Sequence, residues 1–249
     1  MPGSADSILR TLEAFGLHWD GDVVCQSDRQ SRYEAALVQL QRLDLTFACS
    51  CSRRELDEQP TDAYPGTCRH GPARPGAGPT AMRFRVDDSR TVSFVDALQG
   101  LVATPLREVG DVIVRRRDGL FAYQLAVVVD DADQGVTHVV RGLDLLPSTP
   151  WQIELQRALG TSQPDYAHVP LIVEPDGAKL AKSRRSVALG EGTAPPSEQL
   201  AWVLAGLGLP VTGTLVGASP TDLLAWATPR FSLQPLQGIT SLPATDIGG

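Results

Sequence analysis

The sequence predicts an α/β fold, and three observations carry this prediction. Helix-start signals and β-rich runs alternate along the chain, as they do where helices cover a sheet. The β-rich run 136–140 ends at Arg141, and the carboxyl ends of strands are where α/β sheets bind ligands. With 249 residues and 42% hydrophobic content, the chain is long enough to bury a large core.

Two helices are predicted near the start of the chain. Asp6 or Ser7 can cap a first helix, which Gly16 would end. Ser31 and Glu34 have the spacing of a capping box, in which each side chain bonds the other residue's backbone N–H. This pattern predicts that a second helix begins at Ser31.

Strand and helix signals then continue to about residue 226. Alternating apolar and polar residues predict strands over 81–86 and 111–114. A helix is expected over 149–159, with Thr149 as its cap and a proline at its first position. Further helices are expected over 197–207 and, with Ser219 as the cap, up to Trp226.

This order predicts one catalytic-type domain over 1–230. We expect an inserted lobe from 44 to about 110 and a loose C-terminal tail over 231–249. No apolar run approaches the ~20 residues that a membrane helix needs, and the start does not resemble a signal peptide, so we expect a cytoplasmic protein.

The net charge of −7 argues against a nucleic-acid binder that works by general positive charge. Arginines nevertheless cluster at 53–54, 115–117 and 184–185. If these clusters share a face, they can hold phosphates while acidic regions repel other parts of a nucleic acid.

Three of the four cysteines, Cys49, Cys51 and Cys68, fall in one short segment. In a cytoplasmic protein such clustering favours a metal site over disulfides, although a group of reduced buried thiols is the alternative. Zinc takes four ligands at the corners of a tetrahedron, so three thiolates leave one position for Tyr64 or His70. Imidazole is the commoner zinc ligand, and the chemistry alone favours His70.

The fourth cysteine, Cys25, lies in an apolar run with Val23 and Val24. This context predicts a buried structural thiol rather than a ligand or a reactive group.

The second half of the chain suggests an amino-acid pocket followed by a phosphate-binding loop. Tyr123 heads an apolar run, and Arg141 at a strand end suits a carboxylate. Lys179 and Lys182, in a glycine-containing loop, can place two ammonium groups on a triphosphate and stabilise phosphoryl or nucleotidyl transfer. The alternatives are a core tyrosine, a surface ion pair and a solvated basic turn.

These residues resemble those of a known family. The segment Lys179-Leu180-Ala181-Lys182-Ser183 is similar to the KMSKS signature of class I aminoacyl-tRNA synthetases, and residues 166–172 are similar to the segment preceding it in the glutamyl and glutaminyl members. Residues 123–126 and 141–144 resemble the glutamate pocket of these enzymes. The likeness runs from about residue 2 to about 230 and is greatest to the glutamyl-queuosine tRNA(Asp) synthetases, a short group without an anticodon-binding domain.

The resemblance implies a Rossmann-like class I catalytic core with an inserted zinc-binding lobe. It implies that glutamate reacts with ATP, assisted by Mg²⁺, to give glutamyl-adenylate, and that glutamate then moves to the cyclopentenediol of queuosine in the anticodon of tRNA(Asp). Lys182, with Lys179 assisting, would contact ATP and stabilise charge on its phosphates. Tyr123 and Arg141 would hold glutamate.

For the metal, the resemblance points to Tyr64 rather than His70. The family pattern Cys-x-Cys followed by Tyr-xxx-Cys occurs here with the same spacing. It implies one structural Zn²⁺ held by Cys49, Cys51, Tyr64 and Cys68.

The sequence departs from the family in one respect. The family opens with a strand and a HIGH motif, whereas residues 1–249 contain no such motif and begin at a point that matches the region after it. We therefore expect a core that lacks its first strand and part of its ATP site. Two alternatives follow: a catalytically silent, zinc-stapled module that binds nucleotide or RNA, and a fragment of an ordinary glutamyl-tRNA synthetase. In each case we expect a monomer.

Overall fold

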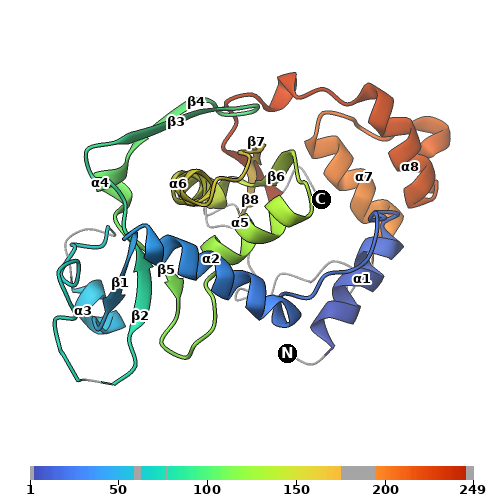
Figure 1. Ribbon diagram of the computed structural model, residues 1–249. Coiled ribbons are helices and arrows are strands. Elements are labelled where there is room, and N and C mark those ends of the chain that lie inside the picture. The colour runs from blue at the N-terminus through green and yellow to red at the C-terminus, as the bar shows by residue number, and fades with distance from the viewer. Residues whose placement is uncertain (1–2, 59–62, 77, 175–193, 245–249) are drawn as a thin grey trace. The chain divides into compact units, whose positions relative to one another are not determined.

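The computed structural model describes residues 3–58, 63–76, 78–174 and 194–244 (Figure 1). The chain forms two units: one spans residues 23–168, and the other combines 1–22 with 169–249. The first unit is mixed α/β and contains both the cysteine cluster and the Tyr123–Arg141 pair.

One sheet of the first unit is antiparallel and three-stranded, in the order β1-β2-β5. Its strands are β1 (Thr46–Cys49), β2 (Ala81–Phe84) and β5 (Val112–Arg115). Cys49 pairs with Ala81 at the end of β1, so the sheet places the first cysteine of the cluster at its edge. The strands predicted over 81–86 and 111–114 are therefore confirmed, although β2 ends earlier than predicted and β5 is shifted by one residue.

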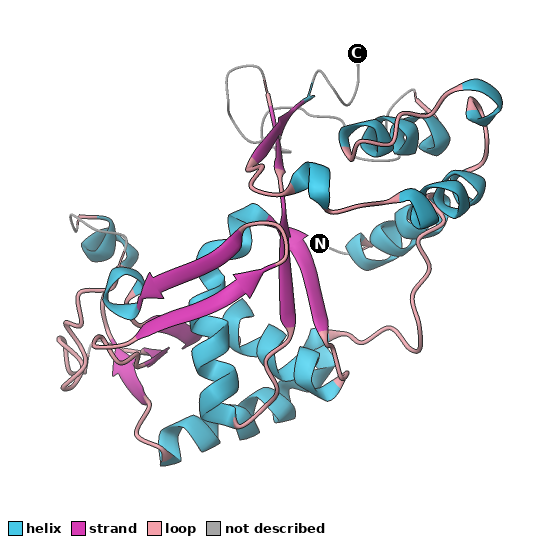
Figure 2. Cartoon of the chain, turned by 90° about the horizontal axis from the view of Figure 1, so that it is seen from above, coloured by secondary structure: helices cyan, strands magenta, loops and turns pink. Residues whose placement is uncertain are grey.

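The other sheet has four strands in the order β4-β3-β7-β6. They are β3 (Thr91–Asp96), β4 (Gly100–Pro105), β6 (His138–Gly142) and β7 (Asp165–Val169). β3 and β4 form an antiparallel hairpin whose strands lie side by side in Figures 1 and 2, and β3 runs parallel to β7 with Asp96 opposite Tyr166. Alternate residues of β3 are buried, and this period of two places Asp96 inside.

Three helices pack against one another in this unit: α2 (Gln30–Arg42), α5 (Tyr123–Asp133) and α6 (Thr149–Leu159). α2 and α5 run side by side in Figure 1. The shorter helices are η1 (Gln26–Arg29), α3 (Arg53–Asp57), α4 (Leu106–Val109) and η2 (Leu143–Ser148). Apolar side chains from these helices and from the strands form one core, which includes Leu37, Leu40, Phe94, Leu125, Ile153 and Leu155.

The second unit is mainly helical. It contains α1 (Ser4–Ala14), α7 (Pro196–Gly206), α8 (Pro220–Ala227), and the short helices η4 (Gly213–Leu215), η5 (Thr228–Arg230) and η6 (Gln234–Leu236). Its core contains Phe15, Leu200, Leu204, Leu223 and Ala227. Its two strands, β8 (Leu171–Val173) and β9 (Ser241–Pro243), pair in parallel. Part of the segment expected to be a loose tail is therefore paired.

The helix-end predictions have mixed outcomes in this unit. Ser219 caps α8 as predicted, because its side chain accepts a hydrogen bond from the Asp222 backbone N–H. Gly16 lies just after α1 with φ 71°, the left-handed conformation expected of a glycine at a helix end. The predicted caps Asp6 and Ser7 are wrong, because α1 already begins at Ser4 after Gly3.

The caps predicted for α2 and α6 are also wrong. Ser31 lies inside α2, which begins at Gln30 directly after η1, so a preceding turn rather than a side chain leads into the helix. Thr149 is the first residue of α6 and likewise follows a 3₁₀ helix without capping it. A capping box that the sequence analysis missed does occur, between Ser52 and Glu55 at the start of α3.

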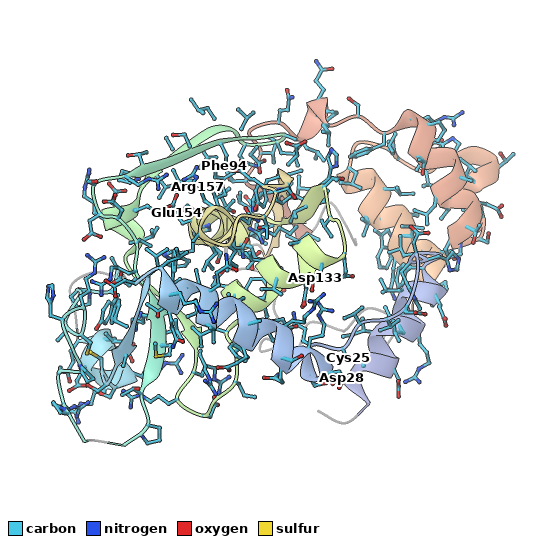
Figure 3. The ribbon with its side chains drawn as sticks, in the orientation of Figure 1. Cys25, Asp28, Phe94, Asp133, Glu154 and Arg157 are labelled. Carbon is cyan, nitrogen blue, oxygen red and sulfur yellow. The ribbon has the colours of Figure 1, made fainter. Side chains whose placement is uncertain are left out.

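The prediction for Cys25 is wrong too. Cys25 is exposed, and Val23 and Val24 beside it are 50% and 42% exposed. Its carbonyl accepts a hydrogen bond from the Asp28 backbone N–H, at the start of the segment that enters α2 (Figure 3). Three apolar residues in a row do not by themselves imply burial when they lie in a connecting segment.

No helix in the described part of the chain is long and apolar enough to cross a membrane. The predicted boundaries of the inserted lobe, 44 to about 110, stay a prediction. So does the expected monomer.

Candidate functional site

The three clustered cysteines meet at one edge of the three-stranded sheet. Cys49 ends β1, Cys51 lies just before α3, and Cys68 lies in a turn. Their Sγ atoms are all within 4.8 Å of one another, and those of Cys51 and Cys68 are 3.6 Å apart. Tyr64 is buried against them, with its Oη 3.5 Å from the Cys49 Sγ and 3.6 Å from the Cys51 Sγ.

These distances fit a tetrahedral metal. Zinc bonds of about 2.3 Å to sulfur and about 2.0–2.2 Å to oxygen require S···S separations of about 3.8 Å and S···O separations of about 3.5–3.7 Å. Three separations lie near these values: Cys51 Sγ to Cys68 Sγ at 3.6 Å, and Tyr64 Oη to the Sγ atoms of Cys49 and Cys51 at 3.5 and 3.6 Å. His70 is exposed and is not part of the ligand group found among the described residues. The geometry therefore favours the tyrosine as the fourth ligand.

The ionisable groups of the cluster have their pKa values shifted in different directions. Burial raises the pKa of Cys51 to about 11. Burial would also raise the pKa of Cys68, but hydrogen bonds from Tyr64 and from backbone N–H groups outweigh it and bring this pKa to about 6. The pKa of Tyr64 is raised by burial and by the neighbouring thiols. The Arg83 guanidinium lies 3.8 Å from the Tyr64 ring centroid, a positive charge beside a group of potential anions.

Gly110 sets how closely the chain can approach Tyr64. Its φ of 65° and ψ of −173° are almost confined to glycine, and a Cβ there would lie 2.7 Å from the Tyr64 backbone nitrogen. We expect Gly110→Ala to displace Tyr64 and to destabilise the fold by roughly 1–3 kcal/mol. Zinc affinity, measured by competition with a chromophoric chelator, should fall in this variant. Gly119→Ala is the control, since it has a similar positive φ of 87° with open space around it, and a loss of zinc affinity in both variants would contradict the role of Gly110.

A second group of polar residues surrounds Arg141. This arginine lies on β6, and Tyr123 is the first residue of α5. The two residues that the sequence assigned to an amino-acid pocket therefore lie beside each other. The Arg141 Nη1 donates to the Tyr123 Oη over 3.4 Å, and Tyr123 is 45% exposed. In the described ranges, Arg141 has no carboxylate within ion-pair distance.

Neutral groups hold the other side of the guanidinium. The Arg141 Nε donates to the His168 Nε2 over 3.1 Å, and its Nη2 donates to the Thr149 Oγ1 over 2.9 Å. Burial raises the pKa of Asp131, which the positive charge of Arg141 partly opposes. The site therefore combines a fixed cation, a phenol that solvent can reach and a nearby acid, an arrangement that can bind an amino acid through its carboxylate.

The sequence prediction and the structure agree on Tyr123 and Arg141, which lie together as expected, although their role stays a prediction. Lys179 and Lys182 lie outside the described residues. Sequence reasoning missed Thr149, which it assigned to a helix cap. It also missed the contact of His168 with Arg141, because no local pattern links the two residues.

The comparisons with known proteins agree with this fold. Residues 1–212 match the catalytic domain of the class I tRNA synthetases (E and Q). The protein therefore belongs to this family of ligases, as its α/β fold and its predicted pocket suggested.

Its relatives include a glutamyl-Q tRNA(Asp) synthetase from Pseudomonas putida (strain F1), 49% identical over 99% of this chain and 81% of that protein. One from Thiobacillus denitrificans is 48% identical over 98% of this chain and 82% of that protein.

Two solved structures share the fold. A glutamate tRNA ligase from Elizabethkingia meningosepticum, solved in complex with its amino acid, is 20% identical with a TM-score of 0.71 and matches 97% of this chain. The glutamate-tRNA synthetase from Elizabethkingia anophelis is 20% identical with a TM-score of 0.75 and matches 99% of it. The chain spans 57% and 59% of the lengths of these two chains.

Proposed function

We propose that this protein is a ligase that activates glutamate with ATP and transfers it to queuosine in tRNA(Asp). The observation that carries this proposal is Arg141, a cation fixed by neutral partners beside the exposed Tyr123. The printed names of the 48–49% identical relatives support the acceptor, since they specify glutamyl-Q and tRNA(Asp).

In this proposal each residue has a limited task. Arg141 and Tyr123 hold glutamate, and Arg141 binds one of its carboxylates. Lys182, with Lys179, meets the ATP phosphates and stabilises the charge that develops when the glutamate carboxylate attacks the α-phosphorus. Mg²⁺ would shield the phosphates of ATP when bound, and pyrophosphate is the leaving group.

We also propose that the cysteine cluster holds one structural Zn²⁺ through Cys49, Cys51, Tyr64 and Cys68. The S···S and S···O separations support this assignment. When bound, the ion would supply a cross-link between the end of β1 and the turn at Cys68, and no chemistry of the ligase reaction is assigned to it.

The acceptor is tested by transferring radiolabelled glutamate to three RNAs. We expect transfer to tRNA(Asp) that contains queuosine, and no transfer to tRNA(Asp) with unmodified guanosine or to tRNA(Glu). Removal of the 3′-terminal adenosine from the queuosine-containing tRNA should leave transfer unchanged, because the acceptor is in the anticodon rather than at the 3′ end.

Each alternative gives a different result. Transfer to the 3′ end of tRNA(Glu) would instead indicate an ordinary glutamyl-tRNA synthetase activity. If no RNA is glutamylated, and if glutamyl-sulfamoyl-adenosine, a stable analogue of the adenylate, fails to raise the melting temperature, the proposal of a ligase is wrong. A silent binding module would then be the better description.

A further inference from the structure

Behind Arg141 lies a buried acid–histidine pair to which the proposed chemistry assigns no task. Asp96 is 1% exposed and His168 is 0% exposed. The two residues come from the neighbouring parallel strands β3 and β7, and the Asp96 Oδ2 is 2.6 Å from the His168 Nδ1. Burying such a pair costs desolvation free energy, which only good hydrogen-bond geometry can offset.

The surroundings determine which of the two carries charge. Burial opposes ionisation of Asp96, but hydrogen bonds from His168 and from the backbone N–H groups of Leu98 and Gln99, at 3.0 and 2.9 Å, hold its pKa below the ordinary value. Burial lowers the pKa of His168. The pair is therefore a carboxylate beside a neutral imidazole.

This state fixes the tautomer of the imidazole. A carboxylate can only accept hydrogen bonds, so the His168 Nδ1 carries the proton and donates it to Asp96. The Nε2 then carries a lone pair and can accept a hydrogen bond. It lies 3.1 Å from the Arg141 Nε, and this nitrogen can only donate. The Thr149 Oγ1 lies 3.3 Å from the same Nε2 and accepts from the Arg141 Nη2.

As a consequence, the side chains of His168 and Thr149, which accept hydrogen bonds from Arg141, are both uncharged. Within the described residues, no carboxylate forms an ion pair with it, and Asp96 contacts the imidazole rather than the guanidinium. The guanidinium of such an arginine is available to form an ion pair with a ligand. A direct ion pair with a protein carboxylate would compete with that ligand.

We propose that Asp96 and His168 are positioning residues that set Arg141 for the carboxylate of the substrate. Asp96 selects the His168 tautomer, and His168 fixes the Arg141 guanidinium by accepting from its Nε–H. This inference rests on the proposed function, because it takes glutamate as the ligand of Arg141.

The test is Asp96→Asn. The asparagine oxygen would take over the backbone N–H groups of Leu98 and Gln99, and its amide N–H would then face the His168 Nδ1. The imidazole proton must move to Nε2, where it opposes the Arg141 N–H, a donor against a donor. We expect the Kd for glutamyl-sulfamoyl-adenosine to rise roughly tenfold or more, while the Kd for ATP stays within about twofold of wild type.

A matched variant isolates the tautomer from the packing. His168→Gln retains an oxygen acceptor for Arg141 but has no tautomer, so it should bind the adenylate analogue more tightly than Asp96→Asn does. Adding Asp96→Asn to His168→Gln should then have little further effect on the Kd. Equal, additive losses from the two changes would indicate only a structural role and overturn the inference.

Nitrogen-15 NMR of the imidazole gives a readout that needs no ligand. His168, assigned by comparison with His168→Gln, should show a protonated Nδ1 and a bare Nε2 in the wild type and the reverse in Asp96→Asn. A wild-type His168 protonated at Nε2, or at both nitrogens, would overturn the proposal even if Asp96→Asn does not fold. If the wild type fails to bind the adenylate analogue, this result counts against the proposed function. The NMR result would still show whether Asp96 fixes the His168 tautomer that faces Arg141.

Discussion

Cys49→Ser is expected to release the zinc that we propose for the cysteine cluster and to unfold this segment locally. A serine hydroxyl is a much weaker zinc ligand than a thiolate, and structural zinc sites bind with apparent free energies of about 10–16 kcal/mol at pH 7, so losing one of four ligands removes much of this stabilisation. Zinc content should fall from one equivalent to a small fraction after dialysis. Hydrogen exchange should increase at the end of β1, where Cys49 pairs with Ala81, and around Cys68.

The chain supplies its own control for this experiment. Cys25→Ser also removes one thiol, but Cys25 is exposed and lies outside the cluster, so this variant should keep its zinc and its melting temperature. If Cys49→Ser retains one full equivalent of zinc, the proposed site is wrong.

A second pair of variants decides the fourth ligand. Tyr64→Phe removes the Oη that lies 3.5 Å from the Cys49 Sγ, so zinc affinity should fall. His70→Ala removes an exposed imidazole and should leave it unchanged. The opposite result would make His70 the ligand.

Lys182→Ala is expected to slow glutamyl-adenylate formation by a factor on the order of 100 or more, with a much smaller effect on glutamate binding. The reason is that an ammonium group placed on the phosphates stabilises charge that develops only in the transition state. Glutamate-dependent exchange of pyrophosphate into ATP measures the rate, and isothermal titration measures binding. A similar loss in both quantities would indicate a binding role alone.

The composition of the chain makes a direct check possible. Lys179 and Lys182 are its only lysines, the other twenty basic residues being arginines. Periodate-oxidised ATP, whose dialdehyde reacts with amines, should therefore label these two positions and the N-terminus, and ATP should protect them. Lys179→Ala provides the comparison three positions away in the sequence, since loss of an assisting lysine should reduce activity less than loss of Lys182. Protection of neither lysine by ATP would contradict the phosphate role.

The strongest sequence predictions were local ones. The cysteine spacing, the cap at Ser219 and the strands over 81–86 and 111–114 each depend on residues close together in the chain. Short-range geometry determines such features, and the sequence displays it directly. The same locality explains the failures at Ser31 and Thr149, where a preceding 3₁₀ turn leads into the helix and a capping residue is not needed.

By itself, the sequence determined the α/β class, the resemblance to a synthetase family and the residue types of both candidate sites. Only the tertiary structure brought the Oη of Tyr64, rather than the ring of His70, to the thiols, and only it exposed Cys25. The contact between Asp96 and His168 joins residues 72 positions apart, and that between His168 and Arg141 joins residues 27 apart. Such contacts form because neighbouring strands bring distant segments together, and no periodicity or spacing along one segment encodes that approach.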